Sequence, residues 1–415
     1  MVRKIMKWGE NDHNKSLQHH KGPLLKYFLG RIARAIKIVL VLGIALSLSS
    51  CGPLFTLYAN HEGWDCEAPN QSNLPQECEE RKKDRNTVSP LKDDEMANTL
   101  AEKFGLMALF AQLAYRQDLK KSGTLDTACD SRANPTFGIP IHSVTGGKWI
   151  RLNDANLKKW SQVKIPNTYA CVNDESGLFY ETYIFINATG IIEEAVIAFR
   201  GTEDSIDWIT NLSAIFGIQP KQYEQASNYL PNLIESLKNL NPDDKPKPKV
   251  YAVGHSLGGG LAQQAGYQFK EIHKVFTFNS SPVTNWTWLR FRGLVKQEYP
   301  IIYRINHGGE FLEKIRFITT SFTSTRYRRY DVGIQFQPRA VFKGHSMKIF
   351  TCSFAALIAS VPDKGDMTTD AAHFYGRKDA LNLFPNDKED EVTKLCECDY
   401  LNMVKETNIG LINVH

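Results

Sequence analysis

The segment Gly254-His255-Ser256-Leu257-Gly258 places a serine between two glycines where an apolar run meets a helical pattern. Residues 250–253 are short and apolar, as in a buried strand, and residues 257–269 follow a helical pattern. A strand that passes directly into a helix needs a sharp turn, in which side chains at both glycine positions would collide with backbone. Such a turn holds its serine in a strained, exposed position at the sheet edge. Ser256 is therefore a candidate nucleophile.

Apolar patterns predict alternating strands and helices on both sides of this turn. A helix is expected over residues 95–116, with one apolar face formed by Leu100, Phe104, Met107, Ala111 and Ala114. Strands are expected at 180–186, which alternates, and at 195–199, whose unbroken apolar run is typical of a strand covered on both faces. An amphipathic helix follows at 223–240, which Pro231 should bend or restart, and further strands are expected at 275–278 and 301–305. This order predicts an α/β protein with a mostly parallel sheet and helices on both faces.

A second motif precedes the serine. Phe199-Arg200-Gly201-Thr202 follows the apolar run, and Asp207-Trp208 comes shortly after it. Together with the serine turn, this pattern resembles the class 3 lipases, the fungal-lipase-like branch of the α/β-hydrolases. The resemblance covers about residues 95–350. Residues 277–282 are similar to that family's T-F-G-x-P segment, except that Asn279 replaces the glycine, a departure expected to affect loop shape more than chemistry.

The resemblance implies roles for individual residues. Ser256 becomes the nucleophile, and the backbone N–H groups of Thr202 and Leu257 form the oxyanion hole, with the Thr202 hydroxyl assisting. The segment after Trp208, which includes Leu212, Ile215 and Phe216, becomes an apolar lid. Asp207 is interpreted as a turn and packing residue.

The acid and the base are expected downstream, in the order serine, acid, histidine. The family's aspartate corresponds to the stretch 303–312, where the carboxylate is Glu310, and some α/β-hydrolases use glutamate in this role. Both His345 and His373 satisfy the order, and His345 is preferred because the segment around it resembles that of relatives. His307 precedes Glu310 and violates the order.

The expected function is hydrolysis of a glycerolipid carboxylic ester, either an acylglycerol or a phospholipid, through an acyl-enzyme on Ser256. No metal or organic cofactor is implied. Two alternatives remain: a short-chain or polysaccharide-linked acyl esterase, and an inactive surface-binding protein that kept the fold.

The N-terminal region is basic and contains an apolar run. The chain has 50 basic and 45 acidic residues, of which nine basic and two acidic residues lie in residues 1–50. The rest of the chain therefore has 41 basic and 43 acidic residues, a balance that gives no indication of nucleic-acid binding. Arg31, Arg34 and Lys37 precede the uncharged run 38–48, which is typical of an export signal. Residues 48–51 resemble a bacterial lipobox, which implies a lipidated Cys51 that anchors an exported protein to a membrane surface; a signal anchor is the alternative.

These patterns predict an export signal at 1–50, a tether at 51–94, the hydrolase domain at 95–378 and an unassigned C-terminal segment at 379–415. Besides Cys51, seven cysteines remain, so at most three disulfides and one thiol are expected. Cys66 and Cys78 are close enough in sequence to be partners. Cys396 and Cys398 are interpreted as disulfide or free thiol, with a zinc site as the alternative.

Overall fold

A computed structural model describes residues 93–123, 125–133, 139, 147–154, 169–201, 221–281, 283, 289, 292–296, 300–308, 329–336, 345–360, 376–386, 394–401 and 410–414. All of them lie in a compact unit, Pro53–His415. The predicted export signal, Cys51 and nearly all of the predicted tether lie outside the described residues.

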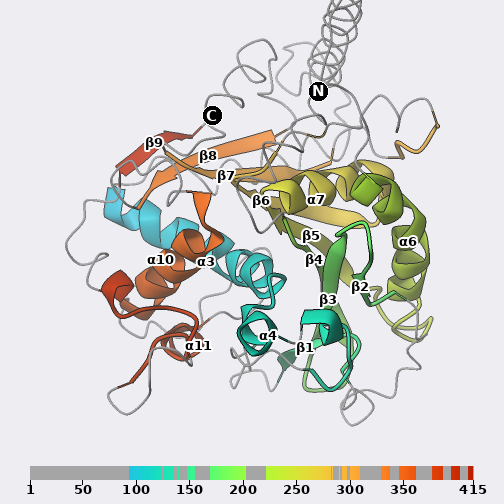
Figure 1. Cartoon of the computed structure of the whole chain (residues 1–415), viewed down its shortest axis with the longest axis horizontal. Coiled ribbons are helices and arrows are strands. Elements are labelled where there is room, and N and C mark those ends of the chain that lie inside the picture. The colour runs from blue at the N-terminus through green and yellow to red at the C-terminus, as the bar shows by residue number, and fades with distance from the viewer. Residues whose placement is uncertain are drawn as a thin grey trace, which may run out of the picture. The chain divides into compact units, whose positions relative to one another are not determined.

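A single mixed sheet runs through this unit (Figure 1). Among the described residues it contains β1 (Lys148–Arg151), β2 (Cys171–Asn173), β3 (Phe179–Ile186), β4 (Ile192–Phe199), β5 (Lys249–His255), β6 (Ile272–Phe278), β7 (Ile302–His307), β8 (Arg329–Gln335) and β9 (Gly410–Val414). Their order is β1-β3-β4-β5-β6-β7-β8-β9, with β2 also paired to β3. Strands β4 to β8 are parallel, whereas β1, β2, β3 and β9 join antiparallel.

Helices cover both faces of the sheet (Figure 1). On one face lie α3 (Asp93–Leu113) and α10 (Met347–Ser360), and on the other lie α6 (Lys221–Lys238) and α7 (Leu257–Gln268). Shorter helices are α4 (Gln117–Ser122), the 3-10 turn η1 (Leu125–Thr127) and α11 (Arg377–Leu381). This arrangement confirms the predicted fold, an α/β-hydrolase-like mixed sheet between two helical layers.

The central strands are buried on both sides because their side chains alternate between the two layers. In β4, Val196 and Ala198 pack into the cluster with α3 and α10, whereas Ala195 and Ile197 pack into the cluster with α6 and α7. The unbroken apolar run of this strand is thus explained by two cores. The alternation expected for β3 is not matched by exposure, since all eight of its residues are buried.

Two sequence predictions about helices have different outcomes. The apolar residues predicted for the first helix are all buried, and the helix ends at Leu113. Pro231 was predicted to bend or restart the second helix, and α6 does not restart there but continues through it. Pro231 is exposed, so water can take the place of the backbone N–H that proline lacks.

Two disulfides join distant parts of the described chain: Cys129 with Cys171, and Cys352 with Cys396. Cys398 is a free cysteine there, and the bond of Cys396 excludes the zinc alternative for this pair. Cys66 and Cys78, which are close enough in sequence to be partners, lie outside the described residues. None of the described helices has the length and apolar character that a membrane crossing requires.

Candidate active site

Ser256 occupies the turn between β5 and α7 with a strained backbone. Its φ of 55° and ψ of −125° lie outside the usual regions for a residue with a side chain. The neighbouring strand holds this turn in place: the Ser256 N–H donates to the Phe278 carbonyl at 3.1 Å, and the Ser256 carbonyl accepts from the Ser281 N–H at 3.1 Å. The strained geometry predicted for the serine is therefore present and is supported from β6.

The two flanking glycines permit the turn to close. A Cβ on Gly254 would lie 2.2 Å from the Gly258 carbonyl oxygen, and one on Gly258 would lie 2.4 Å from the Phe199 carbonyl oxygen. Neither contact is sterically possible, as the sequence predicted. The second contact also shows that the start of α7 packs directly against the end of β4.

His345 lies just before α10, and its imidazole faces the serine. Its Nε2 is 3.1 Å from Ser256 Oγ. Ser256 is buried, so the exposed position predicted for it was wrong, and His345 is half-buried. The structure thus brings together the predicted nucleophile and the preferred base, at the separation expected for a serine and the base that activates it.

The expected oxyanion donors come from two chain segments. Leu257 is the first residue of α7, so its N–H is among those at a helix start that lack an intrahelical acceptor. Thr202 lies outside the described residues, but Gly201 is described: a Cβ there would lie 3.1 Å from Ser256 Cβ. The strand end that precedes Thr202 therefore reaches Ser256.

Four other predicted features lie outside the described residues: Glu310, the alternative base His373, the turn residue Asp207 and the lid with Leu212, Ile215 and Phe216. His307, which the order excluded, is described at the end of β7. Its Nε2 accepts the Phe336 N–H at 3.2 Å, and its Nδ1 lies 3.0 Å from the Gly308 carbonyl oxygen. Backbone groups thus engage both ring nitrogens of His307.

Residues 107–298 match the Phospholipase-like family model, described as a Tle-like phospholipase domain. The matched range includes Ser256 and ends before His345. A curated relative, the extracellular phospholipase A1 of Serratia liquefaciens, is 34% identical over 95 residues, which cover 23% of this chain and 26% of that protein. The chain therefore spans about a quarter of the length of the curated relative that it matches. The family model and the relative are both described as phospholipases.

Two side chains that sequence reasoning missed adjoin the pair Ser256 and His345. The ring of His255 lies between Tyr115 and His345: its Nδ1 is 2.6 Å from the Tyr115 hydroxyl oxygen, and its Nε2 is 2.6 Å from the His345 carbonyl oxygen. His255 occupies a variable position of the serine motif, which carries no signal for this role. Tyr115 could be found only by knowing where α3 ends in space.

A buried ionic cluster is built around Arg116, which follows Tyr115 in the chain, and also contains Asp118, Arg151 and Glu181. Arg116 Nη1 is 3.0 Å from Glu181 Oε1, and Arg151 Nε contacts the same carboxylate. Burial alone would lower the pKa of the Arg116 guanidinium, but the carboxylates of Glu181 and Asp118 raise it above its ordinary value. Arg116 is therefore charged and held firmly in the interior.

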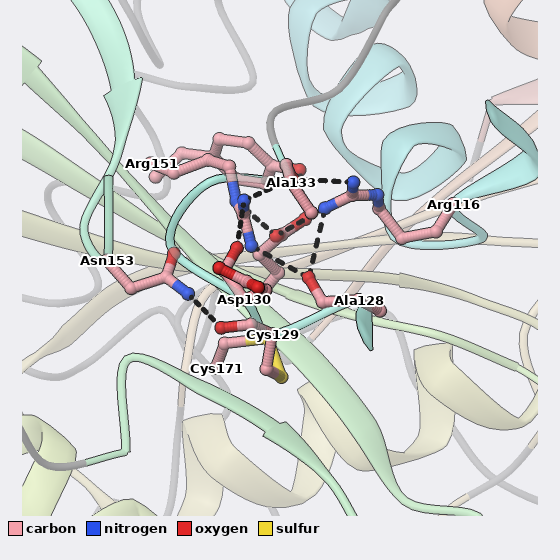
Figure 2. Close-up of a disulfide and its surroundings, with 10 residues drawn as sticks. Arg116, Ala128, Cys129, Asp130, Ala133, Arg151, Asn153 and Cys171 are labelled. Atoms are coloured by element: carbon pink, nitrogen blue, oxygen red, sulfur yellow. Dashed lines mark hydrogen bonds and ion pairs between the residues drawn. A yellow bond between two sulfur atoms is a disulfide. The ribbon is translucent and has the colours of Figure 1, made fainter. Parts of the chain in front are cut away.

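The same guanidinium groups hold the loop that carries Cys129 (Figure 2). Arg116 donates to the carbonyls of Ala128 and Ala133, and Arg151 also donates to the Ala128 carbonyl. The bond from Cys129 to Cys171 fixes this loop to β2. The cluster and the disulfide together support the chain segment that follows Tyr115.

Proposed function

We propose that this protein is a serine hydrolase that cleaves carboxylic esters of glycerolipids, with phospholipids as the preferred class. The observation that carries the proposal is the 3.1 Å separation between His345 Nε2 and Ser256 Oγ at a strained strand-to-helix turn. A serine becomes a useful nucleophile when an adjacent base accepts its proton.

The proposed reaction proceeds through an acyl-enzyme. His345 Nε2 accepts the proton of Ser256 as Oγ attacks the ester carbonyl, and the N–H groups of Leu257 and Thr202 stabilise the oxyanion. His345 then gives the proton to the leaving alcohol, and water releases the fatty acid by the reverse sequence. Glu310 orients the imidazole through Nδ1. Gly308, two residues before Glu310, follows the end of β7, which is the edge where α/β folds deliver site residues.

The choice of phospholipids rests on the two comparisons. The matched family model is described as phospholipase-like, and the matched relative is named a phospholipase A1. The motif resemblance to class 3 lipases supports the wider glycerolipid class. An apolar lid with Ile215 and Phe216 would favour long acyl chains over the short ones of the alternative esterase.

The nucleophile is tested by Ser256→Ala, which should lower kcat by several orders of magnitude, because serine and base act as a unit. Ser353→Ala is the matched control: Ser353 is buried in α10, and its hydroxyl makes no hydrogen bond in the described part of the chain. A fluorophosphonate probe should label the wild type and Ser353→Ala but not Ser256→Ala. Wild-type activity in Ser256→Ala would refute the proposed function, and a wild-type protein that resists labelling would support the inactive binder.

The substrate class is tested with mixed-chain phosphatidylcholine vesicles, triacylglycerol emulsions and a series of nitrophenyl esters of increasing chain length. Release of fatty acid from the phospholipid at a higher kcat/KM than from the triacylglycerol supports the proposal, and the released chain identifies the position cleaved. Activity confined to short esters would instead favour the alternative esterase.

The two candidate bases are separated by His345→Ala and His373→Ala. Loss of activity in His345→Ala should approach that of Ser256→Ala, since one histidine serves both acylation and deacylation. Glu310→Gln should cost less, because part of the hydrogen bonding survives. An active His345→Ala beside an inactive His373→Ala would assign the base to His373.

We further propose that the protein is exported and anchored through a lipidated Cys51, as the lipobox resemblance implies. Stable anchoring takes more than one acyl chain. The mature protein should begin at Cys51 and enter the detergent phase, and Cys51→Ala should release it or leave the signal uncut. An N-terminus upstream of residue 38 in the wild type would favour the signal anchor.

A further inference from the structure

We propose that Tyr115 and His255 form a positioning pair that holds the backbone of His345, and with it the base, in register with Ser256. This inference rests on the proposed function, because it assigns His345 as the base. Neither residue touches the reacting atoms in this scheme, and both act through His345.

The direction of the hydrogen bonds follows from the acceptor at one end. The His345 carbonyl can only accept, so His255 Nε2 carries the proton and donates to it across 2.6 Å. In the neutral ring Nδ1 is then an acceptor, and the Tyr115 hydroxyl donates to it across 2.6 Å. The result is a two-bond chain from the end of α3 to the backbone of the base.

Burial makes this chain stronger than a surface hydrogen bond. Tyr115 is 9% exposed and His255 is 5% exposed, and hydrogen bonds strengthen where the local dielectric is low. Removal of either partner would leave a buried polar atom without its bond, at a cost in free energy. The pair therefore resists displacement of His345.

Tyr115 and His255 hold the backbone of His345, which a triad carboxylate does not contact. A carboxylate at Nδ1 sets the orientation of an imidazole ring, whereas His255 fixes the carbonyl and thus the position of the His345 backbone. The two rings also lie 4.9 Å apart at 47°. Rotation and translation of the base are then restrained by different groups.

Tyr115 is itself well anchored. It follows the end of α3 and precedes Arg116, whose backbone is left-handed and whose guanidinium is held by Glu181. On the other side, a Cβ on Gly201 would lie 2.8 Å from the Tyr115 hydroxyl and 2.5 Å from the His255 carbonyl oxygen. The hydroxyl therefore packs against the strand that leads to the expected oxyanion donor, as well as against the nucleophile strand.

The test compares Tyr115→Phe and His255→Phe with His255→Gln. Phenylalanine keeps the ring of Tyr115 and puts a larger apolar ring in place of the His255 imidazole, and at both positions it removes the hydrogen bond. The glutamine amide can donate in place of Nε2 and accept in place of Nδ1. Since a misplacement of about 1 Å can cost about a hundredfold in rate, we expect kcat to fall about tenfold in Tyr115→Phe and about a hundredfold in His255→Phe. His255→Gln should recover most of that loss, with KM within about twofold of the wild type throughout.

The matched control is Tyr251→Phe, on the same strand as His255. Its hydroxyl donates to Glu194 Oε1 at 3.2 Å in the buried interior, away from the pair. This variant should keep the wild-type kcat. Rates of fluorophosphonate labelling at Ser256 should fall with kcat in the two pair variants, because labelling also requires a positioned base, while Tm stays within a few degrees.

The outcomes separate this inference from the proposed function. Wild-type kcat and labelling in Tyr115→Phe and His255→Phe, beside an inactive Ser256→Ala, would overturn the positioning pair and leave the proposed function standing. A loss of kcat that His255→Gln does not restore, together with a lowered Tm, would assign a packing role and also overturn it. An active Ser256→Ala would instead refute the proposed function.

Discussion

Two residues other than glycine have positive φ angles around the serine turn, Ser256 at 55° and Asn279 at 43°. For Ser256 the strain is part of the turn that presents the hydroxyl. Asn279 stands where the class 3 lipase pattern has glycine, and asparagine tolerates the left-handed region better than most residues. Its N–H donates to the Ile305 carbonyl at 2.9 Å, and its Oδ1 accepts the His307 N–H at 2.8 Å. The asparagine side chain, which a glycine would lack, therefore links the segment after β6 to the end of β7.

This explanation of Asn279 gives a graded prediction. Asn279→Gly should lose only the side-chain bond, a cost of about 1 kcal/mol in the free energy of unfolding. Asn279→Ala should lose the same bond and add about 1–2 kcal/mol of left-handed strain. Urea unfolding of both variants measures the difference. Equal stability of the two variants would contradict the role of the backbone angle.

The sequence allowed part of this residue-scale site to be predicted. The serine turn and His345 could be found because a motif and a flanking segment carry them. His255 and Tyr115 could not, since their roles depend on the meeting of residues 115, 255 and 345, which no local pattern encodes. The side-chain hydrogen bond of Asn279 could not be predicted either. From the sequence, the replacement of glycine by Asn279 was expected only to affect loop shape.

Among the elements, the central ones were predictable and the peripheral ones were not. Strands β4, β5 and β6 and helices α6 and α7 carry long apolar patterns because they form the two cores. Strands β1 and β2 have four and three residues, too few for a periodic signal, and are held by pairing with β3. Strand β8 likewise depends on its neighbours, β7 and β9.

The buried ionic cluster links β1, β3 and the end of α3, so it gives a prediction at the scale of elements. Glu181→Gln should leave the guanidinium groups of Arg116 and Arg151 short of a buried counter-charge and should lower the free energy of unfolding by about 3–5 kcal/mol. Glu235→Gln, which removes the exposed partner of Lys238, should cost far less, because solvent screens a surface ion pair. Denaturant unfolding of both proteins measures the contrast, and similar costs would show that the cluster contributes little.

For the molecule as a whole, the sheet extends further along the chain than the sequence indicated. The segment 379–415 could not be assigned from its weak periodicity, yet β9 within it pairs antiparallel with β8. An edge strand of five residues is defined by its partner more than by its own pattern. The predicted boundary at residue 378 remains a prediction, but residues 410–414 belong to the same sheet as the nucleophile strand.

The two described disulfides close loops with sequence separations of 42 and 44 residues. The first loop ends before the segment 172–351, which contains no cysteine, and the second loop begins after it. On the loop-entropy view, each should contribute about 4 kcal/mol of stability. The double variant Cys129→Ala/Cys171→Ala should also lower kcat, because that loop supports the segment after Tyr115. Cys352→Ala/Cys396→Ala is the matched variant. Calorimetry and ester kinetics on both proteins check this, and an unchanged kcat in the first would show that the loop does not influence the site.

The bond between Cys352 and Cys396 also determines whether the protein separates into fragments after a protease cuts it. A single backbone cut between these two cysteines would produce one fragment that carries Ser256, His345 and Cys352, and a second fragment that carries Cys396 and β9. The sulfur bridge keeps both fragments in one molecule, so β9 stays beside β8 and the nicked protein migrates as an intact chain until thiols are added. Whether the two halves of a nicked molecule stay together in this region is thus governed by the redox state of the surroundings and not by the continuity of the backbone.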